Sequence, residues 1–449
     1  MTTPIYDFVT RYLHRGGPRF HMPGHKGSPH LGCEERDITE IDGADVLYAP
    51  DGIIAESEDN ASALFGTSHT FYSAEGSTLA IKAMLALVSA KARAEGTRPF
   101  VLAGRNAHKA FLYACALLDL EAGWLYGEGG EHICSCTLTA KAVEEALTSV
   151  PTLPCAVYIT SPDYLGRESD VAGIARVCHS FGVPLLVDNA HGAYLQFLSP
   201  SRHPIALGAT ICCDSAHKTL PVLTGGAYLH LSHSGAERFS AEEVRRALSL
   251  FASTSPSYLI LQSLDLCNRT LSEDYGERLT ACAERAEQMR AVLRGEGYRV
   301  AHTEPLKVTV DGRPLGYTGL ALASALRERG AEAEFADEEQ VVLMVTPETE
   351  EAHWELLAEV LCSLPKQAPL REEEAFCLPC GGEQRMTIRQ AMLSPCEWVE
   401  TKAAVGRICA SPTVSCPPAV PLAVSGERIT EESAALFLRY GFERICVVR

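Results

Sequence analysis

The stretch "CDSAHKTLPVLTGG", residues 213–226, places a histidine and a lysine directly after an apolar run, "GATICC", residues 208–213. Such a run is typical of a strand that is buried on both faces of a parallel sheet. Lys218 therefore lies a few residues past the end of a predicted buried strand. A solvated loop lysine and an amine held in a pocket for covalent bonding both fit that position, and the rest of the sequence decides between them.

Composition narrows the class of protein. The chain has 449 residues, 46% hydrophobic and 21% charged, which is typical of a globular protein with two to four domains. Its 57 acidic and 39 basic residues give a formal charge of −18, so we expect no nucleic-acid or membrane partner, because phosphate binding needs clustered cations. We expect no secretory leader or membrane helix. The 17 cysteines, many in apolar segments, predict reduced thiols in the cytoplasm.

Short apolar runs alternate with helical patterns between about residues 75 and 230. Between the second and third runs, residues 174, 177, 178 and 181 are apolar at helical spacing, with Asp170 as a predicted N-cap and Gly182 just past the C-terminus. Repeated strand–helix–strand units predict an α/β protein with a mostly parallel sheet. The runs are "FVLAG" (100–104), "CAVYIT" (155–160), "VPLLVD" (183–188), "ATICC" (209–213) and "GAYLHL" (226–231).

The remaining segments predict further domains. Residues 258–295 have a long helical pattern, and the following residues mix strands with helices as in a smaller α/β domain. A linker-like stretch and the proline-rich "CPPAVPLAV" (416–424) follow. The predicted division is an N-terminal segment (1–60), a large cofactor-binding domain (61–257), a small α/β domain (258–365) and an appended C-terminal module (366–449).

Two further signals accompany Lys218. In "SAEGSTLAIKAMLALV" (73–88), Gly76, Ser77 and Thr78 open a helix, and the free N–H groups of a helix start can bind an anion. Asp188 ends a buried strand, where ligands bind in open α/β sheets. Taken alone, the first signal is an ordinary helix start and the second an ordinary capping acid.

The three signals together are more specific than any one of them. Neighbouring parallel strands would bring Asp188 and Lys218 to the same edge of the sheet. A lysine, an acid and an anion site at one edge are what a pyridoxal phosphate site requires: the lysine forms an imine, the acid keeps the pyridine nitrogen protonated, and the helix start holds the phosphate.

The chain resembles the bacterial ornithine/lysine/arginine decarboxylase family, which has the aspartate-aminotransferase fold (fold type I). The likeness spans residues 18–268, and the proline-rich tail is similar to the family's C-terminal domain. It implies a large domain with a mostly parallel seven-stranded sheet, a smaller α/β domain and a C-terminal module. The segments that carry it are "RFHMPGHKG", "DITEIDGADVLYAPDGII", "FYSAEGSTLAI", "RNAHKA", "YITSPDYLG", "LLVDNAHGA", "DSAHKTLPVLTGGAYLH" and "STSPSYLILQSLD".

The resemblance implies a role for each matched residue. Lys218 would carry pyridoxal 5'-phosphate, Asp188 would pair with the pyridine nitrogen, and His191 would lie near the cofactor's phenolic oxygen or the substrate. His108 would stack on the ring. Further cofactor contacts are implied for Gly76, Ser77, Thr78, Ser215 and His217.

The resemblance also implies an activity. The expected reaction is decarboxylation of arginine, lysine or ornithine to the corresponding amine and CO2, feeding polyamine synthesis. Another pyridoxal phosphate reaction, such as transamination or aldolase-type cleavage, and a non-catalytic relative of the fold remain alternatives. The segment 253–258 resembles one that reaches the neighbouring subunit's cofactor, so we expect a homodimer with shared active sites, which could assemble further.

Three positions depart from the family's usual residues. Asn189 stands where a glutamate is usual, Glu75 replaces an asparagine, and Ala216 replaces a threonine. None of them touches the lysine or the pyridine acid, but they bear on which substrate is used.

A basic substrate also calls for an acidic pocket. Candidate acids are Asp42, Asp45, Asp51 and Glu427, each of which also fits a surface or capping role. The lone C-x-x-C motif formed by Cys377 and Cys380 is read as a linker with reduced thiols, and no metal site is predicted.

Overall fold

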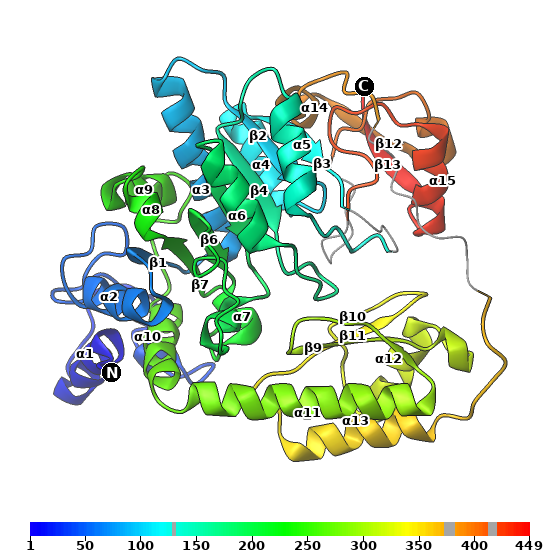
Figure 1. The fold of residues 1–449 in the computed structure, drawn as a ribbon. Helices are drawn as coiled ribbons and strands as arrows, with labels where there is room; N and C mark the ends of the chain where they lie inside the picture. Colours follow the sequence, from blue (N-terminus) through cyan, green and yellow to red (C-terminus); the bar gives the residue numbers. More distant parts are fainter. Residues whose placement is uncertain (128–131, 372–381, 412–419) are drawn as a thin grey trace.

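The computed structural model describes residues 1–127, 132–371, 382–411 and 420–449 (Figure 1). Its centre is a seven-stranded sheet in the order β1-β7-β6-β5-β4-β2-β3. Strand β7 is antiparallel to both neighbours, and the other adjacent pairs are parallel, which confirms the predicted mostly parallel sheet. The strands are β1 (His69–Ser73), β2 (Phe100–Gly104), β3 (Glu121–Leu125), β4 (Ala156–Thr160), β5 (Leu185–Asp188), β6 (Ile211–Asp214) and β7 (Ala227–Leu231).

Each of the five predicted apolar runs forms one strand of this sheet, and β1 and β3 have no counterpart among them. β3 lies at the sheet edge, and because its first four residues are only partly buried it lacks a continuous apolar run. The helix predicted between β4 and β5 is confirmed as α6 (Val171–Ser180). The Asp170 side chain accepts a bond from Gly173 N at 2.9 Å, and Gly182 follows the helix with φ of 71°.

Helices cover both faces of the sheet (Figure 1). Helices α3 and α4 pack on one face against Tyr158 and Leu186, and α5 and α6 pack on the other against Val157 and Val187. This burial on both faces explains why the central strands read as continuous apolar runs. The helices around the sheet are α3 (Gly76–Ala94), α4 (Lys109–Leu118), α5 (Ala140–Ser149), α6, α7 (Ala216–Thr219), α8 (His233–Ala236) and α9 (Ala241–Ser249).

The smaller α/β region follows. The predicted long helical stretch is two helices, α10 (Tyr258–Ser272) and α11 (Tyr275–Glu296), and α11 runs along the four-stranded antiparallel sheet β10-β11-β9-β8 (Figure 1). The strand predicted near residue 300 is confined to two residues. The remaining elements are β8 (Arg299–Val300), β9 (Lys307–Asp311), α12 (Gly319–Glu328), β10 (Phe335–Ala336), β11 (Val341–Met344) and α13 (Glu351–Ser363).

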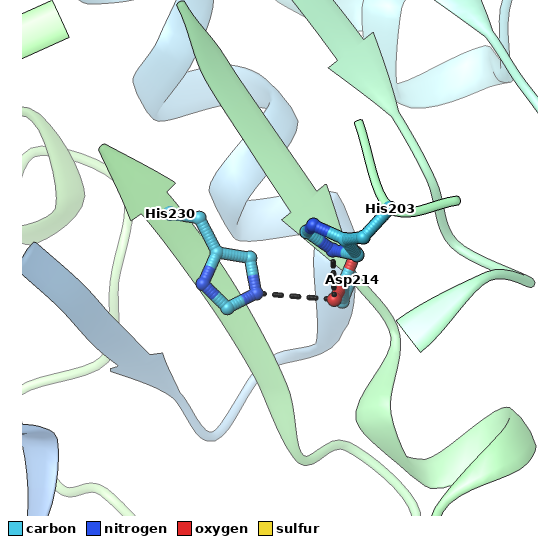
Figure 2. Close-up of side chains that lie close together, drawn as sticks. All are labelled: His203, Asp214 and His230. Carbon is cyan, nitrogen blue, oxygen red and sulfur yellow. Dashed lines mark hydrogen bonds and ion pairs between the residues drawn. The ribbon is translucent and has the colours of Figure 1, made fainter. Parts of the chain in front are cut away.

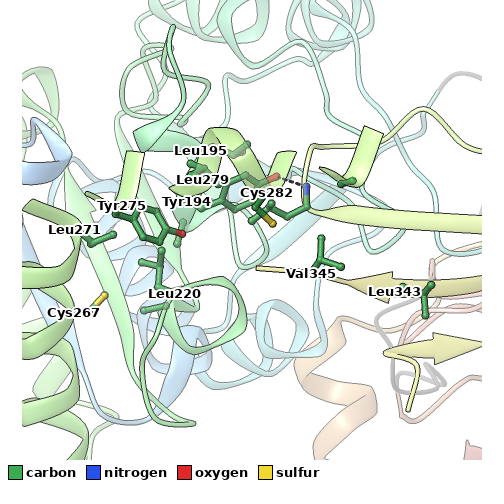
Figure 3. Packing of buried hydrophobic residues seen from close by; sticks show 14 of the residues in the cluster. Tyr194, Leu195, Leu220, Cys267, Leu271, Tyr275, Leu279, Cys282, Leu343 and Val345 are labelled. Atoms are coloured by element: carbon green, nitrogen blue, oxygen red, sulfur yellow. Dashed lines mark hydrogen bonds between the residues drawn. The ribbon is translucent and has the colours of Figure 1, made fainter. Parts of the chain in front are cut away.

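A continuous apolar cluster joins the two regions. Figure 3 shows Tyr194 and Leu220, from the side of the large sheet, in the same cluster as Leu279 of α11 and Val345, which follows β11. Helices α1 (Pro4–Arg15) and α2 (Ile53–Phe65) also pack into this cluster. None of the helices in the described residues combines the length and apolarity that a bilayer crossing requires.

The C-terminal module packs against both regions. Its Leu422 and Phe437 share an apolar cluster with Tyr164 and Val342. One ion pair also ties it to the large sheet, since Glu427 accepts two hydrogen bonds from the Arg105 guanidinium, at 2.7 and 2.8 Å. The module contains α14 (Ile388–Leu393), β12 (Cys396–Glu400), α15 (Glu431–Arg439) and β13 (Arg444–Val448).

This pair is almost completely buried, with Arg105 1% and Glu427 3% exposed. We expect Glu427→Gln to lower the free energy of unfolding by about 3–5 kcal/mol, because it leaves the guanidinium buried without its counter-charge. Arg98→Ala, which breaks an exposed pair with Glu121, is the control and should cost about 1 kcal/mol or less. Denaturant unfolding of both variants is the measurement, and equal small losses would contradict a stabilising role for the buried pair.

Candidate active site

A cavity of about 310 Å³ lies at the carboxyl edge of the large sheet, and all of the predicted catalytic and cofactor-binding residues line it. They come from the start of α3, the start of α4, the turn after β5 and the turn after β6. The structure therefore brings together residues that are up to 142 positions apart in the chain. Those residues are Gly76, Ser77, Thr78, His108, Asp188, His191, Ser215, His217 and Lys218.

Lys218 lies on the short helix α7, directly after β6. β5 and β6 are adjacent and parallel, with Asp188 paired to Cys213, so the turns that carry Asp188 and Lys218 leave the same edge of the sheet. The Lys218 amine points to the turn after β5, where its Nζ lies 3.1 Å from His191 Nε2. Lys218 thus lies in one pocket with Asp188 and His191, as expected for an amine held for covalent bonding and not for a solvated loop lysine.

Asp188 is buried, at 2% exposed, and hydrogen-bond donors surround its carboxylate. Tyr158 donates its hydroxyl to Oδ2 at 3.0 Å, the backbone N–H of Ala190 donates to Oδ1 at 3.2 Å, and the Cys213 thiol lies 3.7 Å from Oδ1. Burial, and secondly the nearby Asp188 charge, raise the pKa of Tyr158 well above its ordinary value, so the hydroxyl stays a donor. A buried carboxylate is costly without such donors, so these bonds stabilise Asp188 and fix its orientation.

Tyr158 was not among the predicted site residues. It lies on β4, which neighbours β5, in a parallel register that pairs Thr160 with Asp188. Its side chain packs on the α3 and α4 face, and only its hydroxyl reaches the carboxylate. The signal available in the sequence was a polar-tipped aromatic residue near the end of an apolar run, which by itself reads as core.

His191 is buried, and its hydrogen bonding is incomplete. Burial, followed by the charges of Lys307 and Lys218, lowers the pKa of His191 well below its ordinary value, so the ring is neutral near pH 7. A neutral ring can accept from the Lys218 ammonium at Nε2, which leaves the proton on Nδ1. That Nδ1 has no partner among the described residues. Tyr164, another cavity residue, meets the ring edge-on, with centroids 5.3 Å apart.

The other end of the cavity is built to bind an anion. Gly76 opens α3 with φ of 69°, and its N–H donates to Gly225 O at 2.7 Å. The next N–H groups have no partner within the helix, as at every helix start. The Ser215 hydroxyl donates to Ser77 Oγ at 2.8 Å, so both hydroxyls lie at this end. His217 is held by Nδ1 at 2.9 Å from Gly226 O, which leaves Nε2 available.

His108 is the N-cap of α4. Its Nδ1 accepts a bond from Ala110 N at 3.2 Å, which fixes the ring, and burial lowers its pKa. The ring is therefore held as a neutral, flat group on the cavity wall, as stacking on an aromatic cofactor would require.

The cavity wall carries polar atoms that lack partners. Asn106 Oδ1, Thr160 Oγ1 and His191 Nδ1 are buried and unbonded among the described residues, and all three residues line the cavity. Such groups are costly unless a ligand or water satisfies them. With the lysine amine, the buried acid and the anion-binding turn, they fit a polar, phosphate-bearing ligand such as pyridoxal phosphate.

None of the acids proposed for a substrate pocket lines this cavity. The prediction that Glu427 lies in a substrate pocket is wrong, because its buried carboxylate forms an ion pair with Arg105. Asp45 accepts bonds from backbone N–H groups, including those of Gly52 and Ile54, and is a capping acid. Among the described residues, the carboxylates on the wall belong to Asp188 and Glu75.

Some other residues noted in the sequence have no part in the site as described. Asp42 and Asp51 are exposed and lie away from the cavity wall. Cys377 and Cys380 lie outside the described residues. The wall also includes Cys134, Pro162 and Tyr164; Pro162 and Tyr164 lie in the segment "YITSPDYLG" that carries the family resemblance, but no role was assigned to them.

Sequence comparison finds related chains along almost the whole length. A family described as "Orn/Lys/Arg decarboxylase, major domain" matches residues 3–313. The uncharacterised protein YaaO of Bacillus subtilis is 30% identical over 461 residues, covering 96% of this chain and 93% of that protein. An arginine decarboxylase of the same organism is 29% identical over 466 residues, covering 97% and 93%.

Solved structures with a similar fold include a lysine decarboxylase and a serine palmitoyltransferase. The constitutive lysine decarboxylase of E. coli has a TM-score of 0.79 at 19% identity, covering 100% of this chain and 82% of that one. A serine palmitoyltransferase of Sphingomonas wittichii has a TM-score of 0.58 at 16% identity, covering 81% and 83%. These neighbours confirm the fold as type I of the pyridoxal phosphate enzymes.

The donors around Asp188 can be tested by removing one. We expect Tyr158→Phe to lower the free energy of unfolding by about 1–3 kcal/mol, because a buried carboxylate loses a hydrogen bond. Tyr275→Phe is a matched control, since that tyrosine is equally buried and its hydroxyl has no partner among the described residues. Chemical denaturation near pH 7 compares the two, and an equal effect of both changes would contradict a specific contribution from the Tyr158 bond.

Proposed function

The chain belongs to the Orn/Lys/Arg decarboxylase family, and on that basis we propose that it binds pyridoxal phosphate and removes the α-carboxylate of a basic amino acid. The products would be CO2 and the corresponding amine, a precursor for polyamine synthesis in the cytoplasm. The observation that carries the proposal is the convergence of Lys218, Asp188 and an anion-binding turn on one cavity. Arginine is the first substrate to test, because relatives of which 93% and 92% of the length is matched include arginine decarboxylases.

Residues of the cavity would hold each part of pyridoxal phosphate. Lys218 would bond to it through Nζ, and Asp188 would pair with the ring nitrogen. The N–H groups that open α3, with the hydroxyls of Ser77 and Ser215, would hold the phosphate. His108, fixed as an N-cap, would lie against the ring. When bound, pyridoxal phosphate supplies a sink for the electron pair left on Cα when CO2 departs.

The chain's own groups then hold charge and move protons. Asp188, oriented by the Tyr158 hydroxyl and the Ala190 N–H, can hold a proton on the ring nitrogen. Lys218 Nζ and His191 Nε2 are 3.1 Å apart, so a proton can pass between them. The depressed pKa of His191 keeps it able to accept that proton near pH 7. Either group can then deliver a proton to Cα.

The test is incubation of purified protein and pyridoxal phosphate with arginine, lysine or ornithine, measuring released CO2 and the amine formed. We expect one of the three to give equal amounts of CO2 and amine. Formation of a keto acid or an aldehyde instead would point to transamination or aldolase-type cleavage and would contradict the proposed reaction.

Lys218→Ala should abolish both turnover and the visible absorbance of the bound cofactor, because no other amine in the described residues lines the cavity. Lys109→Ala is the control, since Lys109 is exposed and its side chain does not line the cavity. An alanine variant at Lys218 that turned over at the wild-type rate would show that the assigned role of that lysine is wrong.

We propose in addition that the protein forms a homodimer in which each active site is completed by the partner subunit. These dimers could assemble further. Phe20, Met22 and Leu31 expose 93%, 57% and 90% of their surface within one short segment, which is unusual for large apolar side chains. The segment 253–258 also lies beside the cavity, since Ser253 N donates to Glu75 at 2.6 Å. The first observation supports a partner surface, and the second places the segment expected to reach the neighbouring site beside the cavity.

Sedimentation equilibrium should give about twice the chain mass of 48.5 kDa. Phe20→Asp should weaken the dimer by about tenfold or more, since a charge would replace buried apolar area. Leu393→Asp, at an exposed position on α14, should leave it unchanged. A wild-type protein with the mass of a single chain would contradict the dimer.

A further inference from the structure

A second cluster of titratable side chains lies beside the cavity, and the proposed mechanism does not use it. His203, Asp214 and His230 are fully buried and converge as Figure 2 shows. Asp214 ends β6, His230 lies on β7, and His203 precedes β6. Each histidine places Nε2 at 3.0 Å from Asp214 Oδ2. The spacing of the three ligand atoms would also fit a metal ion.

The hydrogen bonds on the far side of the rings argue against a metal. His203 Nδ1 faces the backbone N–H of Ile205 at 3.3 Å and must therefore accept. A neutral His203 then carries its proton on Nε2, where a metal would need a lone pair. His203 is thus a donor to Asp214, and the cluster is a hydrogen-bonded carboxylate.

The Asp214 carboxylate is supplied with donors on both oxygens. Besides the two histidines on Oδ2, Asn189 donates its amide to Oδ1 at 2.7 Å, and the Cys212 thiol lies 3.7 Å from the same oxygen. Burial opposes ionisation of Asp214, but the hydrogen bonds donated by the two histidines lower its pKa below the ordinary value. Asp214 is therefore a buried anion that the surrounding donors keep in one orientation.

Its partners are in turn fixed. The Phe65 ring packs on both histidines, with centroids 5.6 and 4.4 Å away, and Thr70 Oγ1 lies 2.9 Å from His230 Nδ1. The position of Asn189 also has a backbone requirement. A Cβ added at Gly192 would lie 2.0 Å from Asn189 Oδ1, so the amide occupies space that only a glycine leaves.

The bond between Asn189 and Asp214 joins the two turns of the active site. Asn189 directly follows Asp188, and Asp214 directly precedes the turn of Ser215 that leads to Lys218. We propose that Asp214 and Asn189 are positioning residues, which fix the cofactor's lysine relative to the cofactor's acid. This inference rests on the proposed function, because both turns matter through the cofactor they would hold.

The test measures the affinity of the apoprotein for pyridoxal phosphate by absorbance titration, with the thermal midpoint of the apoprotein measured beside it. Asn189→Ala removes the link and should weaken cofactor binding by about tenfold, as expected for one hydrogen bond to a charged group, and it should also lower the midpoint, because the buried Asp214 carboxylate loses a donor. Asn189→Asp should be at least as damaging, because two carboxylates would then face each other.

The exchanged pair separates positioning from general damage. In Asn189→Asp/Asp214→Asn, the introduced amide can donate to the introduced carboxylate while its carbonyl still accepts from both histidines. We expect cofactor affinity within about threefold of the wild type and better than either single variant, since the link is restored. Thr70→Val, at the far end of the network, should lower the midpoint but change cofactor affinity less than twofold.

The outcomes are distinguishable. If Asn189→Ala bound the cofactor as tightly as the wild type, or if the exchanged pair were no better than the worse single variant, the positioning role would be wrong. If Thr70→Val weakened cofactor affinity as much as Asn189→Ala, the network would contribute to general stability and not specifically to cofactor positioning. Stoichiometric zinc in the purified protein, lost in Asp214→Asn, would make the cluster a metal site. A wild-type protein without cofactor affinity would instead overturn the proposed function.

Discussion

Two carboxylates, Asp188 and Asp214, end adjacent parallel strands in the interior of the protein, and each is surrounded by hydrogen-bond donors, because a buried carboxylate without them is costly. For Asp188 the donors are Tyr158 and a backbone N–H, and for Asp214 they include two histidines and Asn189. These donors come from β4, β7 and the turns between strands. The need to satisfy two neighbouring buried carboxylates thus fixes how the central strands and the active-site turns lie relative to one another.

Among the described residues, those of the smaller α/β region do not line the cavity itself but hold the turn of Tyr164, which forms part of the cavity wall. The turn that carries Tyr164 is bonded to this region, since Thr309 Oγ1 donates to Leu165 O at 3.0 Å and Tyr164 donates its hydroxyl to Glu334 at 2.7 Å. Lys307, fully buried on β9, lies 3.6 Å from Glu304 and 5.7 Å from the Tyr164 ring centroid. Because Tyr164 meets His191 edge-on, the position of this region bears directly on the proton-transfer pair.

The sequence predicted the central strands and the active-site edge because both depend on local signals. Apolar runs marked the buried strands, and the residues directly after them could be assigned to one edge of the sheet. The strand β3 was missed because an edge strand is only partly buried and lacks that signal. Glu427 was misassigned because its partner, Arg105, lies 322 positions away, and no local pattern reports such a pairing. Tyr158 was missed for a similar reason, since its hydroxyl acts across a strand pair while its ring reads as core.

The three departures from the family's usual residues have different physical consequences. The Glu75 carboxylate, next to the turn proposed for the phosphate, is held by Ser253 N at 2.6 Å, so its charge is directed to the loop after α9. Ala216 is fully buried in the apolar core cluster, where a methyl side chain fits its surroundings. Asn189 is the departure that creates a contact, because an amide can donate to Asp214 whereas a glutamate would place a second negative charge beside it. A neutral residue after Asp188 and a carboxylate at the end of β6 are therefore compatible choices.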